Sequence, residues 1–215
     1  MSNKDSKNKI HLVFDLGGVV FRLDKMIAIQ RFKEIGVTQV EEFLDDYAQK
    51  GIFGDLEAGK LTAEQYRDEL SRIIGKQLTM KQLEYAWTGY AAELYQRNFD
   101  ALLRLRREGF PVALLSNTNP FMMRWVRSNE FDGHGHGIEH YFDRLYLSYE
   151  MRMMKPSPQI FQAMIDGEQT TPDNILFIDD SSHNCEAAAA LGVQTLNPEN
   201  GSDWRPAVFK AAGLE

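Results

Sequence analysis

The sequence predicts an α/β fold in which a parallel sheet core carries an inserted all-helical cap. In residues 8–22 and 97–215, short apolar segments alternate with helical patterns, which is typical of the units that build a parallel sheet. In residues 23–96 apolar residues recur at helical spacing instead, and we expect about four helices and no strand there. A chain of 215 residues is long enough for both parts to bury a core.

Composition excludes several classes of protein. Hydrophobic residues make up 43% of the chain, too many for a disordered protein, and no apolar run approaches the ~20 residues of a membrane span. The formal charge of -7 argues against a nucleic-acid partner or an anionic membrane, although a phosphorylated substrate can still bind locally. A single cysteine, Cys185, and a polar start without an apolar signal segment predict a cytoplasmic protein with a disordered tail at residues 1–7. The oligomeric state stays open.

The first apolar segment, Ile10–Phe14, ends at Asp15, Leu16 and two glycines. A buried strand that ends in a carboxylate and glycines is how a ligand site at the edge of a parallel sheet begins. This segment alone leaves a second interpretation open, in which Asp15 only caps a tight turn.

The inserted segment carries helix signals along its length. Apolar residues have helical spacing in residues 26–35 and 40–47. The pairs Thr62–Gln65 and Thr79–Gln82 have capping-box spacing, in which each side chain satisfies a backbone donor of the first helical turn. We therefore expect helices to begin after both threonines.

The second half of the chain alternates between strands and helices. The segments expected as strands are 112–115, 145–147, 175–178 and 193–196. The helices expected between them are 99–108, one that begins at Pro120, one that Ser157 caps and Pro158 begins, and 185–191.

Polar residues gather at the carboxyl ends of these strands or in the loops that follow. They are Asp15, Ser116, Asn117, Lys155, Asp179 and Asp180. In an open parallel sheet these positions share one edge, where ligands bind. A nucleophile, hydrogen-bond donors, a cation and carboxylates able to hold Mg²⁺ are the groups that phosphoryl transfer needs.

Each of these residues also has a purely structural interpretation. Ser116 could begin a helix, Lys155 could be an exposed loop lysine, and the adjacent acids at 179 and 180 could cap a turn. Paired carboxylates repel each other, however, so a bound cation explains the acidic pair better than a turn does.

Four segments resemble, in order, the four motifs of the haloacid dehalogenase-like (HAD) hydrolases. They are FDLGGVV (14–20), LLSNTN (114–119), KP (155–156) and FIDDS (177–181). The helical insert is similar to the cap of that family, and the resemblance is greatest to its glucose-1-phosphate phosphatase-like subgroup. It covers nearly the whole chain and implies a Rossmann-like core.

The resemblance also implies catalytic and substrate-binding roles. Asp15 would attack phosphorus and form an aspartyl-phosphate. Ser116 and Asn117 would hydrogen-bond the phosphoryl oxygens, and Lys155 would neutralise them as a compact positive charge. The substrate would be a small phosphorylated metabolite.

For the metal, the resemblance implies Mg²⁺ on Asp15, the backbone of Gly17, Asp179 and Asp180, all with hard oxygen ligands. Gly17 is a departure, because most phosphatases of the family carry there an aspartate that protonates the leaving oxygen and then activates water. Such general acid–base help is worth ~10²–10⁴ in rate. We expect slow turnover, a distal acid, or a substrate with a more acidic leaving oxygen, and we expect Gly17→Asp to raise turnover if this position alone is limiting.

The predicted function is Mg²⁺-dependent hydrolysis of small phosphate monoesters, such as a sugar 1-phosphate, through phospho-Asp15. One alternative is a 2-haloacid dehalogenase, in which Asp15 attacks carbon without a metal and activity survives EDTA. The other is a non-catalytic phosphate-binding regulatory module, which would bind phosphate and Mg²⁺ without turnover.

Two further groups of residues have two interpretations each. Trp87, Tyr90 and Tyr95 could line a substrate pocket or pack in the core of the cap. Arg22 and Asp24 follow the Asp15 loop closely enough to contact a substrate, or they are ordinary surface charges.

Overall fold

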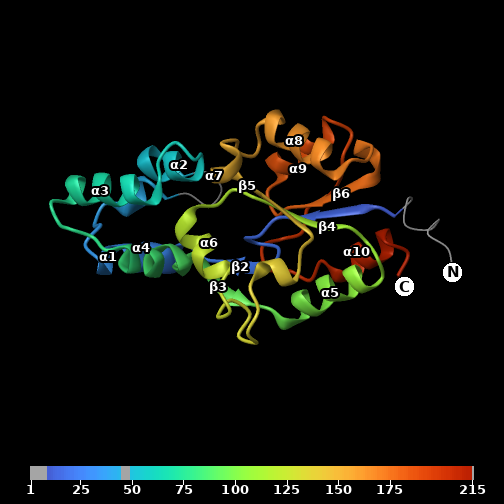
Figure 1. Cartoon of the computed structure of the whole chain (residues 1–215), viewed down its shortest axis with the longest axis horizontal. Coiled ribbons are helices and arrows are strands. Elements are labelled where there is room, and N and C mark those ends of the chain that lie inside the picture. Colours follow the sequence, from blue (N-terminus) through green and yellow to red (C-terminus); the bar gives the residue numbers. More distant parts are fainter. Residues whose placement is uncertain (1–8, 45–48, 215) are drawn as a thin grey trace.

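The computed structural model describes residues 9–44 and 49–214, and its core is a five-stranded parallel sheet in the order β5-β4-β1-β6-β7 (Figure 1). The strands are β1 (His11–Phe14), β4 (Val112–Ser116), β5 (Arg144–Leu147), β6 (Ile175–Ile178) and β7 (Gln194–Leu196). All five expected strands are present and every pairing is parallel, so the predicted α/β core is confirmed. The tail predicted at residues 1–7 lies outside the described residues.

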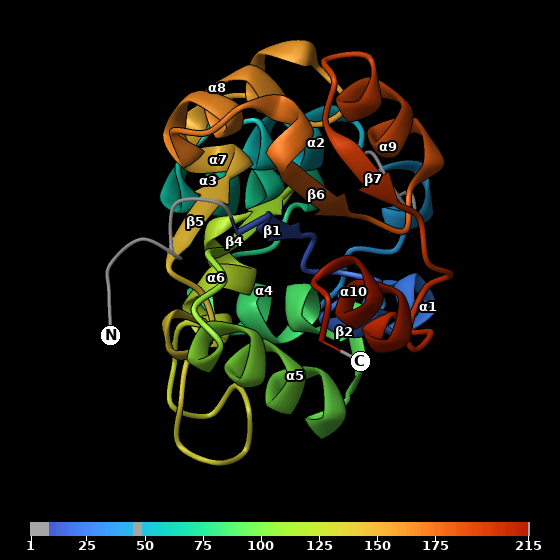
Figure 2. The ribbon, with the colours of Figure 1, turned by 90° about the vertical axis from the view of Figure 1, so that its right-hand side faces the viewer.

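Helices cover both faces of this sheet (Figure 2). On one face lie α5 (Gln96–Arg107) and α10 (Arg205–Ala211), and on the other lie α8 (Pro158–Glu168) and α9 (Ser182–Ala189). Side chains alternate along a strand, so Leu12 and Phe14 of β1 enter one buried cluster and Val13 enters the other. Burial on both sides explains why the strands are almost continuously apolar.

Two short helices follow strands at the carboxyl edge of the sheet, α6 (Pro120–Val126) after β4 and α7 (Ser148–Met151) after β5. Pro120 and Pro158 both begin helices, as predicted, because the fixed φ of proline suits the first helical position. The sequence pattern did not predict α7 or α10. None of the helices in the described residues has the length and apolar character needed to cross a membrane.

The cap contains four α-helices, α1 (Lys25–Glu34), α2 (Gly51–Glu57), α3 (Ala63–Ile74) and α4 (Met80–Trp87), the number expected, although no helix was predicted at the position of α2. Both predicted capping boxes form, at Thr62 and at Thr79. An aromatic cluster holds the helices together, with neighbouring ring centroids 5.2–5.5 Å apart; it consists of Phe32, Phe53, Tyr66 and Trp87. Rings at these separations bury large apolar areas and add favourable edge contacts.

Two predictions for the cap are wrong. A strand, β3 (Ala91–Leu94), pairs antiparallel with β2 (Phe21–Leu23), so the cap segment is not entirely helical. The sequence of β3 has weak strand propensity, and the pairing with β2 decides its conformation. The helical spacing at 40–47 gives only the 3₁₀ turn η2 (Val40–Glu42), and residues 45–48 lie outside the described part.

Candidate active site

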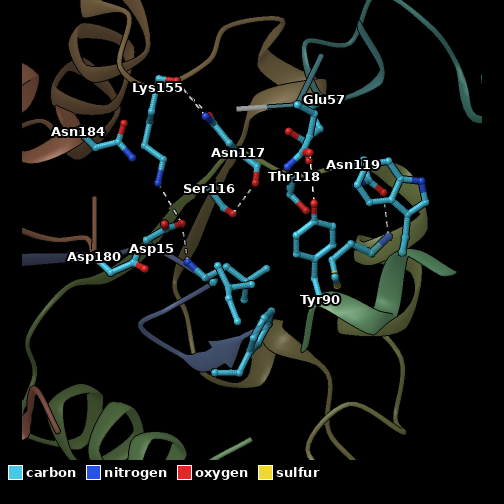
Figure 3. Close-up of a pocket in the computed structure, with 17 residues that line it drawn as sticks. Asp15, Glu57, Tyr90, Ser116, Asn117, Thr118, Asn119, Lys155, Asp180 and Asn184 are labelled. Carbon is cyan, nitrogen blue, oxygen red and sulfur yellow. Dashed lines mark hydrogen bonds and ion pairs between the residues drawn. The ribbon is translucent and has the colours of Figure 1, made fainter. Parts of the chain in front are cut away.

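A pocket lies where the carboxyl edge of the sheet meets the cap (Figure 3). From the core it is lined by Asp15, Leu16, Gly17, Ser116, Asn117, Thr118, Asn119, Met122, Lys155, Asp180 and Asn184. From the cap and the β2 segment it is lined by Phe21, Leu23, Gln49, Glu57, Trp87 and Tyr90. The structure therefore brings the predicted site residues together at one edge, with the exception that buried Asp179 lies behind the pocket wall.

Lys155 is the centre of the charged network on the core side. Its ammonium nitrogen lies 2.9 Å from Asp15 Oδ1 and 2.6 Å from Asp179 Oδ2, and it donates to the Leu115 carbonyl at 3.0 Å. Lysine has three N–H donors, so these three acceptors use all of them. A phosphate beside Asp15 would feel this charge at close range, and a direct hydrogen bond would replace one of the three contacts.

The two acidic residues after β6 have different surroundings. Asp179 is fully buried, and its carboxylate accepts from Lys155, from the Ser181 amide and from the Asn184 side chain. Asp180 is partly exposed and lines the pocket beside Asp15. The saturated hydrogen bonding of Asp179 suits a residue that holds Lys155 in place.

Asn117 joins two loops of the site. Its side chain donates to the Lys155 carbonyl and accepts from the Lys155 amide, both at 2.9 Å. Ser116, at the end of β4, lines the pocket, and its hydroxyl donates to the Asn117 carbonyl at a long 3.3 Å. The Ser116 hydroxyl is therefore easily redirected to a ligand, whereas the Asn117 side chain already has partners.

The carboxylates of Asp15, Asp179 and Asp180 offer oxygens within 4.8 Å of one another. Burial and the neighbouring carboxylates raise the pKa of Asp15, opposed by Lys155, and raise the pKa of Asp180 to about 6. Three carboxylates and one ammonium leave two negative charges when all are ionised. A divalent cation with a preference for oxygen ligands fits this donor set.

Two glycines after β1 meet close neighbours. Gly18 has a φ of 76°, and a Cβ there would lie 2.2 Å from an oxygen of Asp180, so only glycine fits beside this carboxylate. A Cβ on Gly17 would lie 2.8 Å from the methyl carbons of Leu23. The Leu23 side chain therefore occupies the space that an acidic side chain at position 17 would need.

The cap contributes residues that the sequence pattern left ambiguous. Trp87 and Tyr90 line the pocket, whereas Tyr95 does not. The Tyr90 hydroxyl donates to Gln49 at 3.2 Å. The indole N–H of Trp87 is buried beside the Tyr66 hydroxyl and has no well-aligned hydrogen-bond partner among the described residues, so a polar group in the pocket could compete for it.

Arg22 and Asp24 lie outside this pocket. The Asp24 side chain accepts from the Met26 amide and caps α1, and Arg22 lies 3.8 Å from Asp24 and 3.7 Å from Glu93. Both side chains therefore have structural partners.

Sequence reasoning missed five polar residues of the pocket, Gln49, Glu57, Thr118, Asn119 and Asn184. Thr118 and Asn119 directly follow Asn117, and Asn184 lies one helical turn beyond Asp180, so extending each motif along the loop or helix would have included them. Gln49 and Glu57 carry no such signal, because they lie in the insert among other polar and charged residues.

The fold and this edge of the sheet define a HAD-like hydrolase: residues 11–192 match the haloacid dehalogenase-like hydrolases, and the chain belongs to that family. Over 195 residues it is 44% identical to a D-ribitol-5-phosphate phosphatase of Bacteroides thetaiotaomicron, covering 91% of this chain and 94% of the relative. The predicted family is confirmed.

Two solved structures are similar over nearly their full length. A HAD-like family hydrolase from Porphyromonas gingivalis has a TM-score of 0.89 and 41% identity, covering 95% of this chain and 98% of its own. A HAD family enzyme from Bacteroides thetaiotaomicron, in complex with magnesium and inorganic phosphate, has a TM-score of 0.82 and 38% identity, covering 93% and 98%.

Proposed function

We propose that this chain is a Mg²⁺-dependent phosphatase that hydrolyses the phosphate monoester of a small polyol or sugar through an aspartyl-phosphate on Asp15. The observation that carries the proposal is the arrangement of Asp15, with Lys155 at 2.9 Å and Asp180 beside it, in a pocket closed by the cap. The similarity to a phosphatase across more than nine-tenths of both chains supports it.

The chain's own residues would act as follows. Lys155 and the Leu16 amide both donate to Oδ1 of Asp15, which fixes the orientation of the nucleophilic carboxylate. The Ser116 hydroxyl would donate to the phosphoryl oxygens, and Lys155 would offset their charge. Asn117 would hold the Ser116 and Lys155 loops together and present its backbone to the substrate.

Asp15, the Gly17 carbonyl and Asp180 are the residues that would hold Mg²⁺ directly. Asp179 belongs to the predicted ligand set, and its contacts with Lys155 and Asn184 favour a supporting position. When bound, the ion would cancel the repulsion between the carboxylate and the phosphate dianion. The magnesium complex of the similar enzyme from Bacteroides thetaiotaomicron supports this choice of metal.

The leaving group would be a polyol or sugar. The similar phosphatase is named for D-ribitol 5-phosphate, in which a primary alcohol of an open chain carries the phosphate. Gln49, Glu57, Trp87 and Tyr90 provide polar groups on the cap side, where the hydroxyls of such a chain would lie. A sugar 1-phosphate, with its more acidic leaving oxygen, stays the competing prediction.

The deciding measurement is phosphate release from D-ribitol 5-phosphate, glucose 1-phosphate and glucose 6-phosphate, each with Mg²⁺ and with EDTA. We expect Mg²⁺-dependent turnover that is fastest with the ribitol ester. We also expect Asp15→Asn to lower kcat by ~10⁴-fold or more, since it removes the nucleophile.

Two outcomes would contradict the proposal in distinct ways. Halide release from 2-chloropropionate that survives EDTA would establish a dehalogenase. Phosphate binding without turnover of any ester, unchanged in Asp15→Asn, would establish a binding module. A preference for glucose 6-phosphate over glucose 1-phosphate would leave the proposal standing and would remove only the competing prediction of a sugar 1-phosphate.

A further inference from the structure

Glu57 is a buried carboxyl group of the pocket to which the functional assignment gives no step in the chemistry. It is the last residue of α2, is 6% exposed, and lines the pocket from the cap. Figure 3 shows it on the opposite side of the pocket from Asp15 and Asp180. Among the described pocket residues it is the one carboxyl group outside the Asp15–Asp180 cluster.

The backbone of Glu57 is tied to the catalytic edge of the core. The Ser148 hydroxyl lies 2.7 Å from the Glu57 carbonyl and accepts from the Thr118 amide at 2.9 Å. Ser148 is fully buried, so both hydrogen bonds are protected from water. The position of Glu57 is thereby coupled to the loop that carries Ser116 and Asn117.

Asn119 is a polar neighbour of the Glu57 side chain. The Asn119 Oδ1 atom accepts from the amides of Phe121 and Met122 and caps α6, so the Asn119 amide group is the part left to interact with the Glu57 carboxyl. Burial raises the pKa of Glu57 to about 8, and the Asn119 hydrogen bond only partly opposes it. The nearby titratable groups of the cap are the phenols of Tyr66 and Tyr90, and burial raises the pKa of Tyr66 further above its usual value.

The in-line geometry of phosphoryl transfer gives a reason for an acid at this place. The nucleophile and the leaving oxygen lie on opposite sides of phosphorus. Asp15 approaches from the core, so the leaving oxygen points toward the opposite, cap-side wall that Glu57 lines. The core offers no acid at position 17, where the space beside Gly17 is filled by Leu23.

We propose that Glu57 is the general acid and general base of this active site, supplied by the cap in place of the acidic side chain absent at Gly17. The inference rests on the proposed phosphatase function. It explains how an alcohol can leave although the loop after β1 carries only one carboxylate, and it makes the docking of α2 onto α7 a requirement for turnover.

The proton balance closes over two steps. In the first, the bond from Asp15 to phosphorus forms, the bond from phosphorus to the alcohol oxygen breaks, and the Glu57 proton passes to that oxygen. In the second, water attacks phosphorus from the same side, gives a proton to the Glu57 carboxylate, and the Asp15–phosphorus bond breaks. Inorganic phosphate is released, and both carboxyl groups return to their starting states.

The other proton donors of the pocket fit this role less well. All three Lys155 protons already have acceptors. Asp180 belongs to the proposed metal set, and the Tyr90 hydroxyl donates to Gln49. Glu57 combines a cap-side position with a proton held at neutral pH.

The experiment compares Glu57→Gln with the wild-type chain on two esters, D-ribitol 5-phosphate and p-nitrophenyl phosphate. The amide keeps the size of the side chain and cannot transfer the proton. We expect kcat for the ribitol ester to fall ~10²–10⁴-fold. The weakly basic nitrophenolate leaves without a proton, so we expect a burst of about one nitrophenolate per active site followed by slow turnover, because only the second step still needs the base.

Glu64→Gln is the matched control, since Glu64 is an exposed glutamate in the first turn of the neighbouring helix α3. It should leave both activities unchanged. Glu57→Asp, which keeps a carboxyl group, should recover part of the ribitol activity and remove the burst, and thermal unfolding would show that each variant is folded.

Three results would overturn the inference while the phosphatase assignment stands. The first is an unchanged kcat in Glu57→Gln. The second is a rise in KM alone, which would indicate a role in substrate binding. The third is an equal loss of kcat on both esters without a burst, which would indicate a structural role. Failure of the phosphatase assignment itself would look different, because the wild-type chain would then turn over neither ester in an Asp15-dependent way.

Discussion

The two sides of the pocket differ in how completely their polar groups are paired. On the core side, Lys155 has three acceptors, and Asp179 accepts from three residues. On the cap side, the Trp87 N–H lines the pocket, and its polar neighbour is the buried Tyr66 hydroxyl behind it, without a well-aligned hydrogen bond in the described part of the chain. The core therefore holds its groups ready for one reaction, and the cap leaves one donor, the Trp87 N–H, that a substrate can use.

This contrast indicates a division of labour. A buried group with all its hydrogen bonds satisfied keeps one geometry, which suits charge stabilisation that must be ready before the substrate arrives. A buried donor without a partner costs free energy until a ligand supplies one, which suits selection among substrates. Glu57 lies on the cap side, yet the Ser148 hydroxyl ties its backbone to the core.

The largest expected effect separates the two acids on the core side. Asp180→Asn should weaken Mg²⁺ binding and lower kcat by ~10²–10³-fold, because it removes a proposed ligand. Asp179→Asn should lower kcat with a much smaller change in the Mg²⁺ concentration needed for half-activity, because it disturbs Lys155. Titration of activity with Mg²⁺ checks both variants, and equal shifts in metal affinity would restore Asp179 to the ligand set.

The next effect tests whether the core can regain an acid of its own. Gly17→Asp alone should not raise turnover, because Leu23 fills the space beside position 17. In the Glu57→Gln chain, adding Gly17→Asp together with Leu23→Ala makes room for the new aspartate. These changes should raise kcat for the ribitol ester at least about tenfold above that of Glu57→Gln alone. Leu23→Ala in the Glu57→Gln chain is the control, and recovery there without the new aspartate would contradict the explanation.

A smaller effect is expected at the Trp87 indole. Trp87→Phe keeps an aromatic ring and removes the N–H donor, so KM for D-ribitol 5-phosphate should rise about 2–10-fold through the loss of one hydrogen bond. The kinetics with p-nitrophenyl phosphate, which has no hydroxyls, should change much less. Equal changes with both esters would mean that the ring's packing, and not the donor, is responsible.

The smallest effect concerns stability. Burial raises the pKa of Glu57 from 4.5, the value of an unperturbed glutamate, to about 8 in the folded chain. Between these two pH values the folded chain therefore holds one proton that the unfolded chain has lost. Stability from this group is therefore lost as pH rises from about 4.5 to about 8. Glu57→Gln removes the buried charge, so it should raise Tm at pH 9 by roughly 2–4 °C for each kcal/mol gained in the free energy of unfolding. At pH 5 the two chains should differ little in Tm. Thermal unfolding of this variant and of Glu64→Gln checks it, and a gain that does not depend on pH would contradict it.

Much of the core could be predicted because its pattern is local. Each strand is a short apolar run buried on both faces, and Asp15, Ser116 and Asp179 lie at or directly after strand ends. Parallel strands bring such positions to one edge whatever the details of packing. The predicted division into core and cap at residues 22 and 96 stays a prediction, and the β2–β3 ribbon lies at both crossings.

The cap resisted prediction where long-range pairing decides conformation. The segment that forms β3 has weak strand propensity and is extended because β2 lies beside it. The helical spacing at 40–47 was not sufficient for a helix in the described residues there, which form a 3₁₀ turn.

The amino-acid sequence by itself determined the α/β class, the family motifs and the absence of an acidic side chain at position 17, because these depend on residue types and their spacing. Tertiary structure alone decided that Leu23 fills the space beside Gly17, that Asp179 faces Lys155, and that Glu57 is buried in the pocket. Burial and proximity depend on how helices dock, and α2 docks on the core through contacts between residues far apart in the chain, such as Ser148 with Glu57.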